Sequence, residues 1–67
     1  MNYKKIFNNL VKEFKKEYTP FFKQMVKIQI DLKGDNAYKF IVEQLLSQFS
    51  DVSPSKANKF KNNNNIP

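Results

Sequence analysis

The chain has 67 residues, a formal net charge of +6, and neither Cys nor His. It therefore has no disulfide, no thiolate metal site, and neither the commonest general base nor the commonest metal ligand. Its single Gly excludes a phosphate-cradling glycine loop, and its other polar residues do not assemble a nucleophile–base–orienter set, so we expect no enzyme, no metal site and no cofactor.

The first predicted element is an amphipathic helix over residues 3–18. At 100° per residue its apolar side chains fall within roughly 140° of arc, and its lysines fall on the opposite side. The apolar set is Tyr3, Ile6, Phe7, Leu10, Val11, Phe14 and Tyr18, and the lysine set is Lys4, Lys5, Lys12, Lys15 and Lys16. The pair Thr19-Pro20 should end this helix, because proline disfavours a helical conformation at the residue before it.

Residues 20–33 have two interpretations. The run from Val26 to Lys33 alternates apolar and polar residues, which is typical of a strand with one dry face. On a helical wheel the apolar residues fall within about 200°, Pro20 is a good start and Gly34 a good end. A strand would have to pair with the same strand of a second copy, because nothing else in the chain alternates. We therefore expect a helix, with the intermolecular strand as the alternative.

Residues 36–50 predict another helix with an apolar stripe and with Asp35 as its N-cap. Phe40 alone projects from the polar face, which makes it a candidate protein contact. The other phenylalanines on apolar stripes are predicted to lie in the core or at a dimer interface. This set is Phe7, Phe14, Phe21, Phe22 and Phe49.

After Asp51 the periodic pattern fades. Ser53 and Pro54 could begin a short helix, whereas the Asn run near the end favours no regular structure. The expected fold is mainly α, a single three-helix domain followed by a short basic tail. We expect the domain at residues 1–52, with helices at about 3–18, 20–33 and 36–50, and at 53–67 a short helix or a flexible Asn-rich tail.

The strand alternative resembles the ribbon–helix–helix DNA-binding proteins, in which an alternating strand precedes two helices and strands from two subunits enter the major groove. Residues 26–32 would form the ribbon, residues 36–50 the first helix and residues 53–61 the second. The resemblance implies a dimer, and it implies that Lys27 and Gln29 occupy the positions of the family's base readers.

The charge is concentrated at the two ends of the chain. Residues 1–17 carry five Lys and two Glu, residues 18–51 carry four Lys and four acids, and residues 52–67 carry three Lys and no acid. Five cations over ~20 Å of helix could follow a phosphate backbone. The candidate nucleic-acid ligands are Lys4, Lys5, Lys12, Lys15, Lys16, Lys56, Lys59 and Lys61.

We expect a small basic protein that acts by binding nucleic acid and that self-associates. The alternatives are a protein-binding inhibitor or adaptor that docks an apolar or Phe40-centred face on a larger protein, a membrane-surface helix, or a merely solvated lysine face. No apolar run approaches the ~20 residues of a membrane span, and no signal peptide is visible, so we expect a cytoplasmic location.

Overall fold

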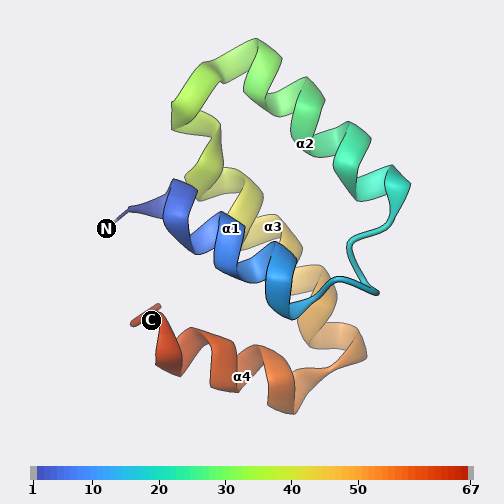
Figure 1. The fold of residues 1–67 in the computed structure, drawn as a ribbon, viewed down its shortest axis with the longest axis vertical. Coiled ribbons are helices and arrows are strands. Elements are labelled where there is room, and N and C mark those ends of the chain that lie inside the picture. Colours follow the sequence, from blue (N-terminus) through green and yellow to red (C-terminus); the bar gives the residue numbers. More distant parts are fainter. Residues whose placement is uncertain (1, 67) are drawn as a thin grey trace.

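The structure is a computed structural model, which describes residues 2–66. Over this range the chain forms helices joined by short turns, with no strand: α1 (Tyr3–Glu13), α2 (Pro20–Lys33), the 3-10 helix η1 (Gly34–Asn36), α3 (Ala37–Val52) and α4 (Pro54–Asn63) (Figure 1). The prediction of a mainly helical fold is confirmed. The strand predicted as the alternative for residues 26–32 is wrong, because these residues belong to α2, where their backbone amides lie one turn after carbonyl groups of the same helix.

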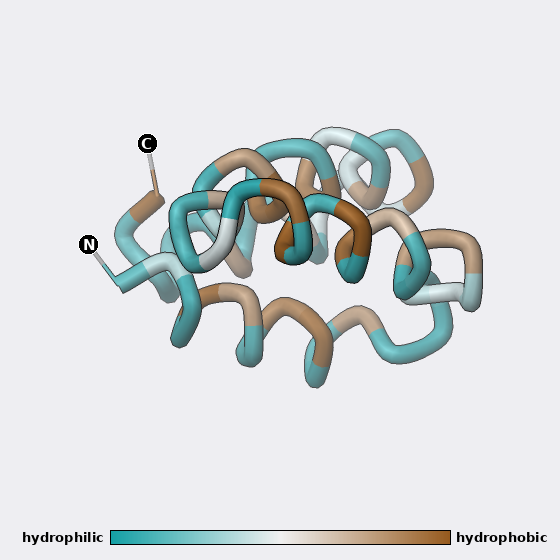
Figure 2. Tube along the Cα trace, turned by 90° about the horizontal axis from the view of Figure 1, so that it is seen from above, coloured by the Kyte–Doolittle hydropathy of each residue, from teal (hydrophilic) through white to brown (hydrophobic). Residues whose placement is uncertain are grey.

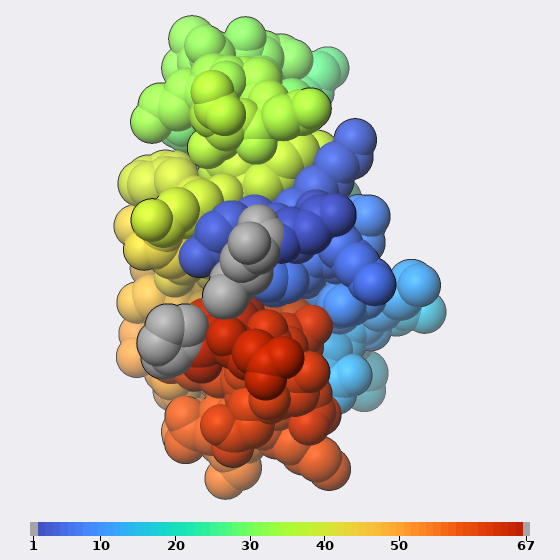
Figure 3. All heavy atoms as spheres, turned by 90° about the vertical axis from the view of Figure 1, so that its left-hand side faces the viewer, coloured from blue at the N-terminus to red at the C-terminus, as the bar shows by residue number. Residues whose placement is uncertain are grey.

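The central element is α3, which contacts α1, α2 and α4. Figures 1 and 3 show α2 and α4 at opposite ends of the molecule, with α1 lying between them. The molecule measures 32 × 26 × 16 Å along its principal axes. None of the helices within residues 2–66 combines the length and apolar character needed to cross a membrane, as the sequence predicts.

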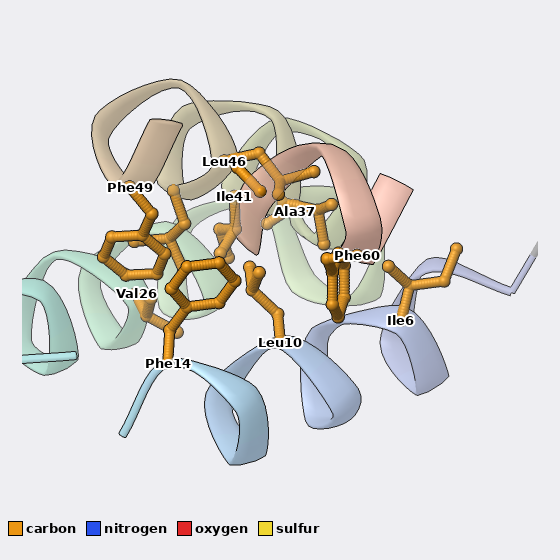
Figure 4. Packing of buried hydrophobic residues seen from close by; sticks show 12 residues of the cluster. Ile6, Leu10, Phe14, Val26, Ala37, Ile41, Leu46, Phe49 and Phe60 are labelled. Carbon is orange, nitrogen blue, oxygen red and sulfur yellow. The ribbon is translucent and has the colours of Figure 1, made fainter. Parts of the chain in front are cut away.

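The core joins α1, α3 and α4 through aromatic rings. Phe14 is fully buried, lies stacked on Phe49 with 4.9 Å between ring centroids, and meets Phe60 edge-on at 6.1 Å. Figure 4 shows Leu10 and Phe14 pointing from the α1 side toward α3. No polar or charged residue is buried within residues 2–66, so the packing energy of the core comes from apolar contact.

The helix predicted for residues 3–18 is wrong at its C-terminal end. α1 ends at Glu13, and Phe14 leaves the helical region with φ −112° and ψ 45° while its N–H still donates to the Leu10 carbonyl. This departure accompanies the burial of the Phe14 ring against Phe49 and Phe60, a tertiary contact that helical periodicity does not encode. Lys15 and Lys16 therefore lie exposed on a turn instead of extending the lysine face of α1.

The range predicted for α2 agrees with the structure. Pro20 occupies its first turn, and Gly34 ends it with a positive φ of 66° while donating its N–H to the Ile30 carbonyl. Val26 is the buried residue of the helix, and Phe22 packs against the core beside it. Phe21, predicted for the core or a dimer interface, is 71% exposed in this chain because it lies on the opposite side of the helix from Val26.

The start of α3 differs from the sequence prediction. The residues after Gly34 make one 3-10 turn, so α3 begins at Ala37 and continues to Val52. Asp35 lies within the 3-10 turn and is not the N-cap; that position belongs to Asn36, whose side chain makes no capping hydrogen bond.

The segment after α3 forms α4, which packs on α3 through the buried residues Ala57 and Phe60. Ser53 and Pro54 occupy the predicted cap and first positions, although Ser53 makes no side-chain cap bond. Two of the four consecutive Asn are helical, contrary to the expectation of no regular structure. Tertiary contacts explain this, because burial of Phe60 stabilises the helix beyond the low propensity of Asn.

Candidate nucleic-acid interface

An open groove of about 400 Å³ lies between α1 and α4, and we call it the α1–α4 groove. It brings together residues from opposite ends of the chain. Its lining consists of Asn9, Lys12, Glu13, Lys56, Lys59, Phe60, Asn63 and Asn64. The lining residues of each helix follow one another at intervals of one, three or four positions, so they lie on one face of α1 and on one face of α4.

Lys12 and Lys59 are the exposed cations of this groove, one on α1 and one on α4. Within residues 2–66 the single ion pair is the one between Lys56 and Glu17, so neither ammonium group is paired to a carboxylate of that range. Glu13 also lines the groove and reduces its positive potential. Asn63 is exposed at the same rim and offers an amide donor.

Lys56 has a different environment from the other two lysines. Its Nζ lies 4.6 Å from the centroid of the Phe14 ring and 4.0 Å from Glu17 Oε1. An ammonium group over an aromatic face is attracted to the ring, and the carboxylate compensates its charge further. Lys56 therefore stabilises the packing of α4 against the turn that follows α1. Its charge is less available to a ligand than the charges of Lys12 and Lys59.

Two of the lining residues, Asn9 and Asn64, form a side-chain hydrogen bond between the α1 and α4 sides of the groove. Asn9 Nδ2 donates to Asn64 Oδ1 at 3.1 Å, and Asn64 Nδ2 donates to the Phe60 carbonyl at 2.9 Å. This link ties the end of α4 to the middle of α1. Sequence reasoning missed it, because nothing in an Asn-rich stretch marks which Asn meets a distant partner.

The remaining candidate lysines do not join this groove. Lys4 lines a separate depression of about 460 Å³ beside Asp35 and Tyr38. Lys61 lies on the α3 side of α4, in a depression that also contains Glu43 and Asp51. The eight predicted ligands are thus divided among several surfaces.

Three candidate lysines lie outside the depressions just described. Lys15 and Lys16 are exposed on the turn after α1. Lys5 is exposed on α1 and lies seven positions before Lys12, so it shares the helix face of Lys12 two turns away. Lys5 therefore lies in line with Lys12 along α1, although it does not line the groove itself.

The base-reading role for Lys27 and Gln29, implied by the ribbon–helix–helix resemblance, loses its structural basis, because residues 26–32 lie within α2 and form no ribbon. Lys27 is exposed on α2, and Gln29 is half-buried with an Oε1 that has no hydrogen-bond partner within residues 2–66. The protein-contact candidate Phe40 is 41% exposed. The Lys33 ammonium lies 4.9 Å from its ring centroid and covers part of it.

The other titratable groups add little to a site. Partial burial raises the pKa of Tyr18 above its ordinary value near 10, and the nearby Tyr38 adds a smaller effect in the same direction. Tyr18 is therefore neutral at physiological pH and adds no charge near the basic residues. Among residues 2–66, no three acidic, His or Cys side chains gather as metal ligands would.

Sequence reasoning also missed an exposed apolar surface on α2. A depression of about 430 Å³ is lined by Phe21, Gln24, Met25, Ile28 and Gln29. The wheel of residues 20–33 contains these residues within its wide apolar arc. It does not show which half of the arc a neighbouring helix covers.

Comparison with protein-family models gives no match, and searches of curated proteins and of solved structures give no significant one. The function of the α1–α4 groove is therefore argued from its own geometry and charge.

Proposed function

We propose that the protein binds nucleic acid through the α1–α4 groove, with Lys12 and Lys59 as ligands of the phosphate backbone. The observation that carries this proposal is the placement of these two exposed ammonium groups on different helices around one open groove. The exposed amide of Asn63 lies at the same groove and can donate a hydrogen bond to a phosphate oxygen.

The chemistry of the groove favours binding that tolerates many sequences. The chain has twelve Lys and no Arg, so it lacks the planar guanidinium that reads guanine and phosphate in a bidentate manner. Lysine acts as a point charge and contacts phosphate, which is common to every sequence. With Lys5, Lys12 and Lys59 engaged, the slope of log affinity against log salt should be about −2 to −3.

The binding of a fluorescent DNA duplex, followed by anisotropy over a range of salt concentrations, tests the proposal. We expect the double variant K12Q/K59Q to bind more weakly and to have a salt slope shallower by about 2, because about one phosphate contact is lost for each lysine. The matched control is K27Q/K39Q, which removes the same charge from exposed positions of α2 and α3. Its salt slope should stay within a few tenths of that of the wild type.

A third variant tests the sign of the local field. E13Q removes the carboxylate that lines the groove, so we expect tighter binding and no loss of fold. The proposal is wrong if the wild type does not bind duplex or single-stranded nucleic acid at low salt. It is also wrong if K27Q/K39Q weakens binding as much as K12Q/K59Q, since net charge alone would then account for the affinity.

Two other binding modes have weaker support. A membrane-surface helix would have to expose the apolar face of α1, but Ile6 and Leu10 of that face are buried in the core. Docking of Phe40 on a larger protein would use a ring that Lys33 partly covers. The larger exposed apolar surface lies on α2.

A further inference from the structure

The outer side of α2 carries a stripe of four apolar residues, Phe21, Met25, Ile28 and Leu32, which we call the α2 seam. Phe21 is 71% exposed, Ile28 48% and Leu32 74%, and Met25 is half-buried. Figure 2, seen from the α2 end, shows apolar segments recurring along this helix. The buried residue Val26 lies on another face, so packing on α3 leaves Phe21, Ile28 and Leu32 exposed, whereas Met25 packs in part against the core.

The spacing of the seam is that of a helix–helix contact. Its residues follow at intervals of four, three and four, which is the alternation of the a and d positions of a coiled coil. Such an alternation keeps the residues on one narrow line of the helix. The same line contains the depression of about 430 Å³ between Phe21 and Ile28.

We propose that the α2 seam is the interface of a symmetric homodimer in which α2 of a second copy packs antiparallel to it. A two-fold axis between Met25 and Ile28 places Phe21 opposite Leu32 of the second copy and Met25 opposite Ile28. Each large residue then meets a smaller or more flexible one. The antiparallel direction also opposes the two helix dipoles, whereas a parallel pair would align them.

The positions of the charged residues on α2 are compatible with a second copy of this chain at the seam. The helix has three lysines, Lys23, Lys27 and Lys33, and all lie more than about 100° around the helix from the middle of the seam. Two copies of a chain of net charge +6 repel each other, and the distance of these lysines from the seam lessens that repulsion at the contact.

The positions that border the seam are uncharged or acidic. Gln24 and Asp31 lie on one edge, and Phe22 and Gln29 lie on the other. In the antiparallel pair Gln24 faces Asp31 of the second copy, so an amide N–H can donate to a carboxylate. The edge residues are therefore compatible with self-association, and they add a polar contact that fixes the direction of packing.

The area of the seam determines how stable the dimer is expected to be. Four partly exposed apolar side chains on a helix ~21 Å long would bury on the order of 500 Å² per chain, below the ~800 Å² of a standard interface. We therefore expect a weak, reversible dimer with a dissociation constant in roughly the micromolar range. Because α2 and α4 lie at opposite ends of the molecule, the two α1–α4 grooves would lie at the far ends of the dimer (Figure 3).

Sedimentation equilibrium of the full chain tests the dimer. The wild type should change from a mass of 8.0 kDa when dilute to twice that mass at high concentration. F21Q/L32Q should raise the dissociation constant by more than about tenfold. The matched control is V52Q, which replaces an exposed apolar residue of α3, 72% exposed, and should dimerise like the wild type. Circular dichroism should show equal helix content in all three proteins.

The direction of packing has its own test. The chain has no Cys, so single cysteines can be introduced without competing thiols. An oxidised mixture of M25C and I28C, which lie on the seam line itself, should give mainly the disulfide between the two variants, whereas a parallel pair would give each variant linked to itself. The proposal is overturned if the wild type is monomeric at every concentration, or if V52Q dissociates the dimer as much as F21Q/L32Q.

Discussion

The two ends of the molecule contrast in how their helices are held to α3. α4 is polar and buries only Ala57 and Phe60, but it is joined to the α1 region by the Asn9–Asn64 hydrogen bond and by Lys56 over the Phe14 ring. α2 is richer in apolar residues, but Val26 is its one buried residue and several large side chains face outward. The contrast shows that the number of apolar residues in a helix does not determine how much of its apolar surface the rest of the chain buries.

The largest expected loss of stability comes from truncating a phenylalanine in the core, and the same truncation on the α2 seam should cost little. F14A should cost about 3–5 kcal/mol, because a fully buried ring between Phe49 and Phe60 is lost, and a domain of this size has little stability beyond that. F21A, which truncates the same residue type on the α2 seam, should change the stability of dilute protein by less than about 0.5 kcal/mol. Urea unfolding followed by circular dichroism measures both. Equal losses would contradict the division between core and seam.

An intermediate effect should come from the turn that joins α2 to α3. Gly34 has a φ of 66°, and a Cβ there would meet no atom within 4 Å, so G34A introduces backbone strain without a clash. We expect a loss of about 1–3 kcal/mol, seen as a lower Tm. Amide hydrogen exchange should show faster opening in α2 than in α4. Equal acceleration in both helices would mean that the two ends do not open independently.

A smaller effect than that of G34A should come from the opposite end. N64A removes the hydrogen bonds to Asn9 and to the Phe60 carbonyl, and we expect it to cost about 1 kcal/mol. N58A, at an exposed Asn within α4, is the matched control and should cost less. Hydrogen exchange in the last turn of α4 reports the difference. If N58A and N64A behave alike, the amide link does not hold α4 in place.

The sequence predicted the elements whose limits are set locally. Pro20 and Gly34 mark the ends of α2 because each acts through its own backbone. The end of α1 could not be predicted in the same way, because Phe14 leaves the helix while packing against two residues from distant parts of the chain. Likewise, α4 persists into the Asn run because Phe60 is buried.

The candidate site was predictable only in part. Periodicity identified Lys12 as part of a lysine face and composition identified Lys59 as part of a basic end, but only the packing of α4 beside α1 brings them to one groove. The same packing compensates the charge of Lys56 with Glu17. The α2 seam was hidden for a similar reason, since a wide apolar arc does not reveal which half a neighbour covers.

The most direct test of the proposed function is a titration of ¹⁵N-labelled protein with a short DNA duplex at low salt, followed by amide chemical shifts. We expect the shifts to change around Lys12, Lys59 and Asn63, and to return toward their free values as salt is raised. Amides of the α2 seam should stay unchanged at constant protein concentration. Changes confined to α2, or no changes at all, would contradict a nucleic-acid interface at the α1–α4 groove.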